Sequence, residues 1–84
     1  MPRIIVERNF DSAVTDDALK AVMERMGPCL EIYKVKWVRS HLATDRKRMM
    51  CEYDAADAES VRTVQREANA KFDRVWAAEV LGTA

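Results

Sequence analysis

Residues 35–57 read VKWVRSHLATDRKRMMCEYDAAD, and this stretch decides the predicted fold. Leu30 to Leu42 alternates with a period of two, and so does Arg48 to Tyr53, which is typical of β-strands. Thr44-Asp45-Arg46 is polar enough to form the turn between them, although it lacks the Asn-Gly or Asp-Gly of a tight hairpin. We therefore predict an antiparallel hairpin here. Trp37, Cys51 and Tyr53 are expected to pack on one side of it, and Lys36, Ser40 and Glu52 to lie on the other, open side.

The chain before the hairpin predicts a strand and a helix. Arg3 to Phe10 is rich in β-branched residues and then alternates with charge, as a strand does. Thr15 is a suitable N-cap, because its hydroxyl can accept a hydrogen bond from a free backbone N–H. Apolar residues at helical spacing follow it. We expect Gly27-Pro28 to end this helix, because Gly tolerates the left-handed cap and Pro cannot continue the hydrogen-bond ladder.

The chain after the hairpin predicts a second helix and a last strand. Asp57 is a good N-cap, and Asn69 can adopt the left-handed conformation that ends a helix. Phe72 to Leu81 alternates again. The chain thus repeats a strand–helix–strand unit. Right-handed crossovers in both halves place the two helices on one face of a four-stranded antiparallel sheet, which is the ferredoxin-like α+β sandwich.

Length and charge restrict the class of protein. A chain of 84 residues holds one domain at most, so we take residues 1–84 as a single domain. Fourteen basic residues balance fourteen acidic ones, and no net charge draws the chain to nucleic acid or to a membrane surface. The basic run Arg46-Lys47-Arg48 is therefore interpreted as a solvated turn. With an uncharged run of only three residues between Arg3 and Glu7, and no apolar run of membrane-spanning length, we expect a cytoplasmic protein.

The face of the predicted sheet opposite the helices, here called the open face, carries apolar side chains that the two helices do not bury. Two helices cannot cover both sides of four strands, and both faces carry large apolar side chains. We therefore expect a homodimer that forms through the open face.

Four side chains are candidate metal ligands. His41 is the only histidine and also a candidate general base, although a histidine near a polar turn is often merely solvated. Cys51 is a soft donor, with Met49 a weaker one, but a buried thiol packed as a small apolar group is the favoured interpretation of Cys51. Glu7 and Glu52 lie on strands that we expect to be neighbours, and they either bind a cation or pair with nearby basic residues.

Two further features bear on ligands and redox state. Trp37, Tyr53 and Trp76 are candidates to line an apolar ligand pocket, and the alternative is that they pack in the core. Cys29 and Cys51 show no CxxC spacing, which favours free thiols over a disulfide.

Several short motifs together carry a family resemblance. They are PRIIVERNF at 2–10, W-x-x-S at 37–40, C-x-Y-D-A at 51–55, A-x-S-V-R at 58–62 and F-D-R-V-W at 72–76. With these motifs the chain resembles the DUF4242 family, whose members include a bacterial nickel-binding protein. The resemblance implies a ferredoxin-like fold, a dimer and nickel as a candidate ligand. Relatives often carry a histidine where Arg39 stands, whereas the histidine here is His41.

Two functions of different classes follow from these residues. The first is a small ligand- or metal-binding protein, with nickel as the candidate metal. The second is a cofactor-free enzyme of the dimeric α+β-barrel kind that acts on a small organic substrate. The binding function leads, because these residues assemble no pair of nucleophile and base.

Overall fold

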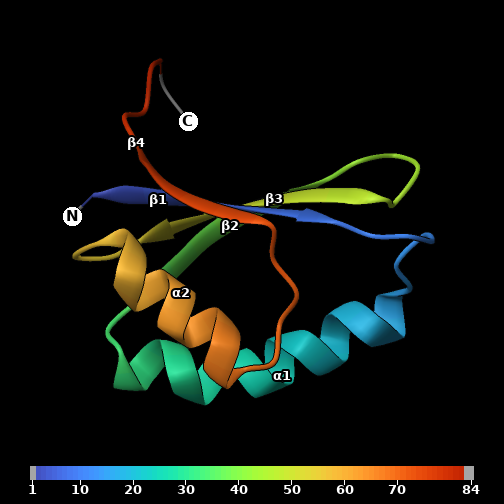
Figure 1. The fold of residues 1–84 in the computed structure, drawn as a ribbon, viewed down its shortest axis with the longest axis horizontal. Helices are drawn as coiled ribbons and strands as arrows, with labels where there is room; N and C mark the ends of the chain where they lie inside the picture. Colours follow the sequence, from blue (N-terminus) through green and yellow to red (C-terminus); the bar gives the residue numbers. More distant parts are fainter. Residues whose placement is uncertain (1, 83–84) are drawn as a thin grey trace.

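The computed structural model describes residues 2–82. It confirms the ferredoxin-like fold: both helices lie on one face of a four-stranded sheet (Figure 1). Along the chain the elements are β1 (Arg3–Asn9), α1 (Asp16–Ile32), β2 (Lys36–Leu42), β3 (Arg48–Asp54), α2 (Ala58–Glu67) and β4 (Arg74–Ala78). Neither helix of this part of the chain is long and apolar enough to cross a membrane.

The sheet places β1 and β3 at its centre. Its strand order is β2-β3-β1-β4, and all three neighbouring pairs are antiparallel. In Figure 1 the two helices lie beneath the sheet, and the other face of the sheet is open. Side chains that alternate along the central strands therefore face either the helices or the open side.

Helix α1 begins as predicted but ends later. The Thr15 hydroxyl accepts a hydrogen bond from the backbone N–H of Ala18 at 3.1 Å. The expected end at Gly27-Pro28 is wrong, because the helix continues to Ile32 with Pro28 inside it. A proline within a helix removes one backbone hydrogen bond. The added turn compensates for this loss, since it packs Cys29 and Leu30 against the core.

Both helices end in the same hydrogen-bonding motif. After α1, Lys34 is left-handed with φ of 54°, and the N–H of Val35 donates to the carbonyl of Leu30 at 2.9 Å. This is a Schellman cap. After α2, Asn69 takes the same role with φ of 52°, as the sequence predicted, and the N–H of Ala70 bonds back into the helix.

The later end of α1 shortens the first hairpin strand. We predicted a strand from Leu30 to Leu42, but Leu30 still belongs to the helix and β2 spans Lys36–Leu42. Its register with β3 shifts between Trp37 and Arg39. After this irregularity Ser40 pairs with Cys51, so that both lie on the helix side of the sheet. Our expectation that Ser40 faces the open side is therefore wrong.

The hydrophobic core lies between the sheet and the helices. Its largest fully buried side chains are Ile4, Val6, Tyr53, Val61, Val64 and Gln65. The last strand, β4, is shorter than the predicted Phe72 to Leu81 and covers only Arg74–Ala78. Cys29 and Cys51 are both free thiols, as predicted.

Candidate functional site

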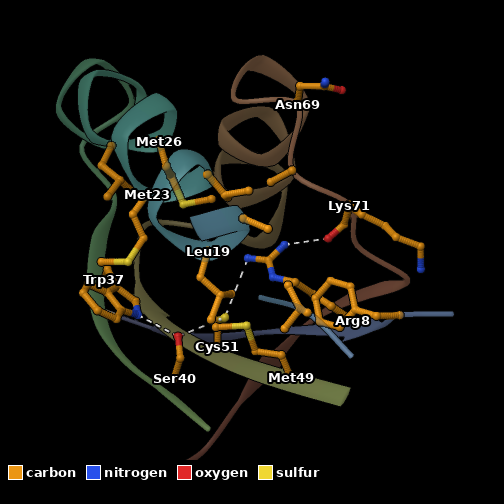
Figure 2. Close-up of a pocket in the computed structure, with 16 residues that line it drawn as sticks. Arg8, Leu19, Met23, Met26, Trp37, Ser40, Met49, Cys51, Asn69 and Lys71 are labelled. Atoms are coloured by element: carbon orange, nitrogen blue, oxygen red, sulfur yellow. Dashed lines mark hydrogen bonds between the residues drawn. The ribbon is translucent and has the colours of Figure 1, made fainter. Parts of the chain in front are cut away.

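A cavity of about 390 Å³ opens between α1 and the helix-facing side of the sheet (Figure 2). Pockets that hold small organic molecules typically measure about 300–1,000 Å³. Apolar side chains form most of its wall; they are Phe10, Val14, Ala18, Leu19, Val22, Met23, Met26, Leu30, Trp37, Met49 and Ala70. The cavity thus has the size and the lining of a site for a small apolar ligand.

One cation lies at the polar end of this cavity. Arg8 points to the helix side of β1, and only 6% of it is exposed. Its Nη1 donates to the backbone carbonyl of Lys71 at 2.8 Å, and its Nη2 donates to the Tyr53 hydroxyl at 3.2 Å and to Cys51 Sγ at 3.7 Å. All three partners are formally neutral groups. Among residues 2–82, none of the ion pairs includes Arg8.

A short chain of hydrogen bonds extends this polar floor toward the cavity rim. The indole Nε1 of Trp37 donates to Ser40 Oγ at 2.9 Å, and the Ser40 hydroxyl donates to Cys51 Sγ at 3.0 Å. Next to Cys51, burial raises the pKa of Tyr53 to about 12, and the nearby Cys51 thiol contributes to the rise. Tyr53 therefore stays a neutral phenol at physiological pH.

The structure separates the three aromatic residues that we predicted to line one pocket. Trp37 lines the cavity, whereas Tyr53 is buried beneath it in the core. Trp76 lies on the open face with 41% of its surface exposed, and its Nε1 donates to Glu7 Oε2 at 2.6 Å. Only Trp37 of the three can contact a ligand within the cavity.

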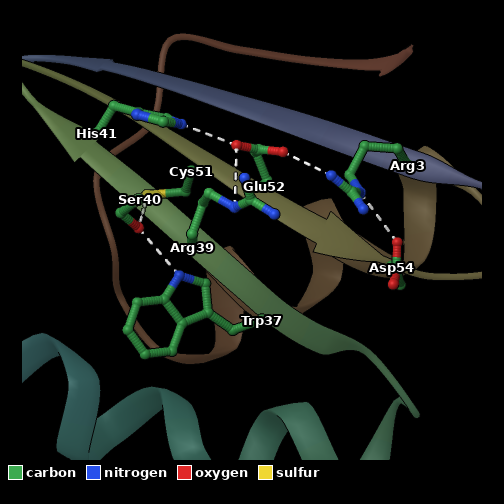
Figure 3. Close-up of polar contacts among 8 residues, drawn as sticks. All are labelled: Arg3, Trp37, Arg39, Ser40, His41, Cys51, Glu52 and Asp54. Carbon is green, nitrogen blue, oxygen red and sulfur yellow. Dashed lines mark hydrogen bonds and ion pairs between the residues drawn. The ribbon is translucent and has the colours of Figure 1, made fainter. Parts of the chain in front are cut away.

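The sheet also separates the four predicted metal ligands. His41, Glu52 and Glu7 lie on the open face, and Cys51 lies on the helix side with Ser40. On the open face His41 Nε2 is 2.8 Å from Glu52 Oε2 (Figure 3). The cavity and this histidine therefore belong to opposite faces, and His41 is not placed to act as a base for a ligand in the cavity.

Arginine side chains surround the carboxylate of Glu52. Arg3 Nη1 lies 2.6 Å from Glu52 Oε1, and Arg39 Nε lies 3.7 Å from Oε2. The hydrogen bond with His41, followed by the one from Arg3, lowers the pKa of Glu52, although burial acts in the opposite direction. Two guanidinium groups already neutralise this carboxylate and disfavour a divalent cation beside it.

The described residues of one chain do not fit a nickel site. Glu7 is engaged by Trp76, and Glu52 is engaged by basic groups. In the part of the chain from residue 2 to residue 82, no three His, Cys, Asp or Glu side chains gather closely enough to hold a metal ion. A nickel site built on these residues therefore requires donors from outside residues 2–82 of one chain.

Sequence reasoning missed Arg8 as a site residue. The signal was present, because Arg8 shares one face of the strand with Ile4 and Val6, and both of these are apolar. A charged residue in line with two core positions is either buried or at the end of the strand. Here it is buried, and it supplies the polar end of the cavity.

Comparisons with known proteins support the fold and the family. The crystal structure of SCO4226 from Streptomyces coelicolor A3(2) superimposes with a TM-score of 0.83, covering 95% of this chain and 99% of that one, at 15% sequence identity. At this identity the likeness shows the fold alone.

No curated protein matches the sequence. The motif-based resemblance is confirmed as far as a nickel-related family, while the name DUF4242 is not among the matches. Residues 5–77 match the family described as nickel responsive protein SCO4226-like, and the chain belongs to this family.

Proposed function

We propose that this protein binds a small organic ligand in the cavity beneath α1. The observation that carries the proposal is a cavity of about 390 Å³ with apolar walls and a buried arginine at one end. Apolar cavities of this kind admit apolar guests, and a few convergent polar groups orient them. The Arg8 guanidinium, the Ser40 hydroxyl and the Cys51 thiol are these polar groups.

The wall of the cavity suits a ligand of variable shape. Met23, Met26 and Met49 all line it, and methionine side chains adjust to irregular apolar surfaces. Trp37 lies at the rim, where 42% of it is exposed, and offers a flat surface for stacking. These features favour a ring or a branched hydrocarbon over a sugar or a nucleotide.

A neutral aromatic probe tests this proposal. In a titration with 2-naphthalenecarboxamide, followed by ¹⁵N–¹H NMR, we expect saturable shifts at the amides of cavity residues. Leu19→Trp fills the cavity and should weaken binding about tenfold or more. The control Lys20→Trp adds the same side chain at the next, exposed position of α1, outside the cavity lining, and should leave binding unchanged. An absence of saturable shifts both with this probe and with its carboxylate counterpart, 2-naphthoate, or equal binding by both variants, would remove the proposal.

We also propose that two copies pair through the open face of the sheet. Trp76 on β4 supplies apolar surface there, because 41% of it is exposed, and it pairs with the buried Ile5 of β1. Light scattering at micromolar concentration should give twice the chain mass, and Trp76→Glu should reduce it to the mass of one chain. A parent protein that is monomeric at that concentration overturns this proposal.

Nickel binding is the second candidate function, and the exposed imidazole of His41 and the family description favour it. Since residues 2–82 do not complete a site, we propose that His41 binds the metal together with donors on a second copy. Calorimetry with nickel should show heat for the parent and for Cys51→Ala, because Cys51 lies on the opposite face. His41→Ala should abolish this heat. If the parent gives no heat, or if His41→Ala behaves like the parent, nickel is not bound through this pair.

A further inference from the structure

We propose that the ligand of the cavity is an organic monoanion, an aromatic or branched aliphatic carboxylate whose head group pairs with Arg8. This inference rests on the proposed function, because it names the class of ligand for the same cavity. In this arrangement the apolar part of the ligand lies against the wall formed by α1, and its carboxylate lies at the buried end of the cavity, beside Arg8.

The charge of Arg8 is the first argument. An arginine guanidinium remains protonated at any physiological pH. Here it is 94% removed from solvent, since 6% is exposed, and its hydrogen-bond partners are a carbonyl, a phenol and a thiol. Burial of a charge is unfavourable unless an opposite charge accompanies it. A bound anion would supply that opposite charge.

The groups around Arg8 do not supply it themselves. Tyr53 remains a neutral phenol, because burial raises its pKa to about 12. Glu7, the neighbour of Arg8 on β1, points to the open face and bonds to Trp76. Lys71 adds no negative charge, and its ammonium group points away from the cavity (Figure 2). The positive charge at the buried end is thus uncompensated within residues 2–82.

Arg8 also has hydrogen-bond donors to offer. The contacts within the described chain use three of its five N–H groups. The weakest of them reaches Cys51 Sγ at 3.7 Å, and sulfur is a poor acceptor. Because Arg8 and Cys51 both line the cavity, a carboxylate oxygen can replace the sulfur as acceptor. Ser40 can rotate its hydroxyl from Cys51 toward the second oxygen.

The rest of the lining restricts the anion to a single charge. Arg8 is the one guanidinium among the described lining residues, and the ammonium of Lys71, the other cation of the lining, donates to the Asn9 carbonyl and to Asp73 Oδ2. Apolar side chains dominate the rest of the wall. A polyphosphate or dicarboxylate would leave a charge buried without a partner, which is unfavourable. A carboxylate with an apolar body satisfies both parts of the cavity.

A pair of probes with the same shape and different charge tests the inference. 2-Naphthoate and 2-naphthalenecarboxamide differ only in the replacement of a carboxylate by an amide. We expect the carboxylate to bind about tenfold or more tightly, because a charge-assisted hydrogen bond is about twice as strong as a neutral one. Equal affinities would overturn the inference and leave the proposed function standing. If neither probe binds, the proposed function itself fails.

Variants of Arg8, and an NMR signal of its side chain, test whether Arg8 causes the preference for the carboxylate. Arg8→Gln should abolish the preference for the carboxylate, Arg8→Lys should restore part of it, and the surface control Lys20→Met should retain it in full. In the parent protein, the Arg8 side-chain Nε–H resonance should shift further with saturating 2-naphthoate than with the saturating carboxamide. This signal needs no variant, so it decides the matter even if Arg8→Gln does not fold. A preference that survives in folded Arg8→Gln, or an Nε–H signal that shifts no further with the carboxylate, overturns the role of Arg8.

Discussion

Two arginines on the same strand show how differently the two faces of the sheet are built. Arg3 points to the open face, where its guanidinium pairs with Glu52 at 2.6 Å and with Asp54 at 3.0 Å. Arg8 points to the helix side, where it is buried among neutral partners. The open face thus balances its own charges. The helix-covered face holds a cation that is not balanced, and it holds the cavity.

The largest difference between the faces should appear in their apolar residues. Ile4 is fully buried under the helices, and its neighbour Ile5 lies on the open face. Ile4→Ala should lower the free energy of unfolding by about 3 kcal/mol. Ile5→Ala should lower it by less, because Ile5 keeps 7% of its surface exposed and lies outside the main core cluster. Urea denaturation measures both values. Equal losses would contradict the comparison and show that the single chain packs Ile5 as tightly as Ile4.

The next effect concerns the polar contacts of the buried arginine. Tyr53→Phe removes an acceptor for Arg8 at a site that water does not reach, and the free energy of unfolding should fall by about 1.5 kcal/mol. The matched control is Tyr33→Phe, since the Tyr33 hydroxyl bonds to Glu67 at 2.9 Å at an exposed position. Tyr33→Phe should lower the free energy of unfolding by less than about 0.5 kcal/mol. Equal effects in urea denaturation would mean that the two tyrosine environments do not differ.

The open face should respond to pH through Glu52. Because its hydrogen bond with His41 and that from Arg3 lower the pKa of Glu52, the ionised carboxylate favours the folded state. This contribution is complete above the unfolded pKa of about 4.3 and is lost as the pH falls through the lower folded pKa. Glu52→Gln should lower the free energy of unfolding by about 0.5–1 kcal/mol at pH 7.

Urea denaturation from pH 7 down to pH 3 measures that pH dependence. The parent should lose more stability on acidification than Glu52→Gln does. Asp57, Glu59 and Asp73 have pKa values shifted in the same direction, so the variant keeps part of the acid dependence. Parallel curves for the parent and the variant would show that Glu52 contributes nothing to it.

The smallest effect is expected at the edge of the open face. Trp76→Phe removes the hydrogen bond to Glu7 from a side chain that is 41% exposed, and should cost only about 0.5 kcal/mol. Thermal unfolding at two protein concentrations checks this value. A larger loss that depends on concentration would show that Trp76 lies in an interface between copies.

Much of the architecture follows from local sequence signals. Thr15 and Asp57 cap their helices as predicted, because a side-chain oxygen beside free N–H groups acts locally. Asn69 ends α2 for a similar reason. The alternation of Met49, Cys51 and Tyr53 predicts one face of β3, and these residues share the helix side.

Two local predictions were wrong where tertiary packing decided the outcome. Gly27-Pro28 carries a strong stop signal, yet α1 continues, since the extra turn packs Leu30 against the core. Strict alternation along β2 places Ser40 on the open face, but the shift in register near Trp37 turns it to Cys51. One irregular residue reverses every later side chain of a strand. The sequence offers no residue pattern that marks this shift.

The sequence itself determined the hairpin at residues 35–57, the order of the helices and strands, and the family. Hydrophobic periodicity, helix caps and short motifs indicate these features, and all three are local properties of the chain. The sites were decided by the tertiary structure. Cys51 and His41 lie on paired strands of one hairpin, yet the sheet places their side chains on opposite faces. Arg8 lies far from Lys71 in the chain, and only the packing of the loop after α2 against β1 joins them at the end of the cavity. Contacts between distant segments depend on register and packing, and a single strand or helix does not contain that information.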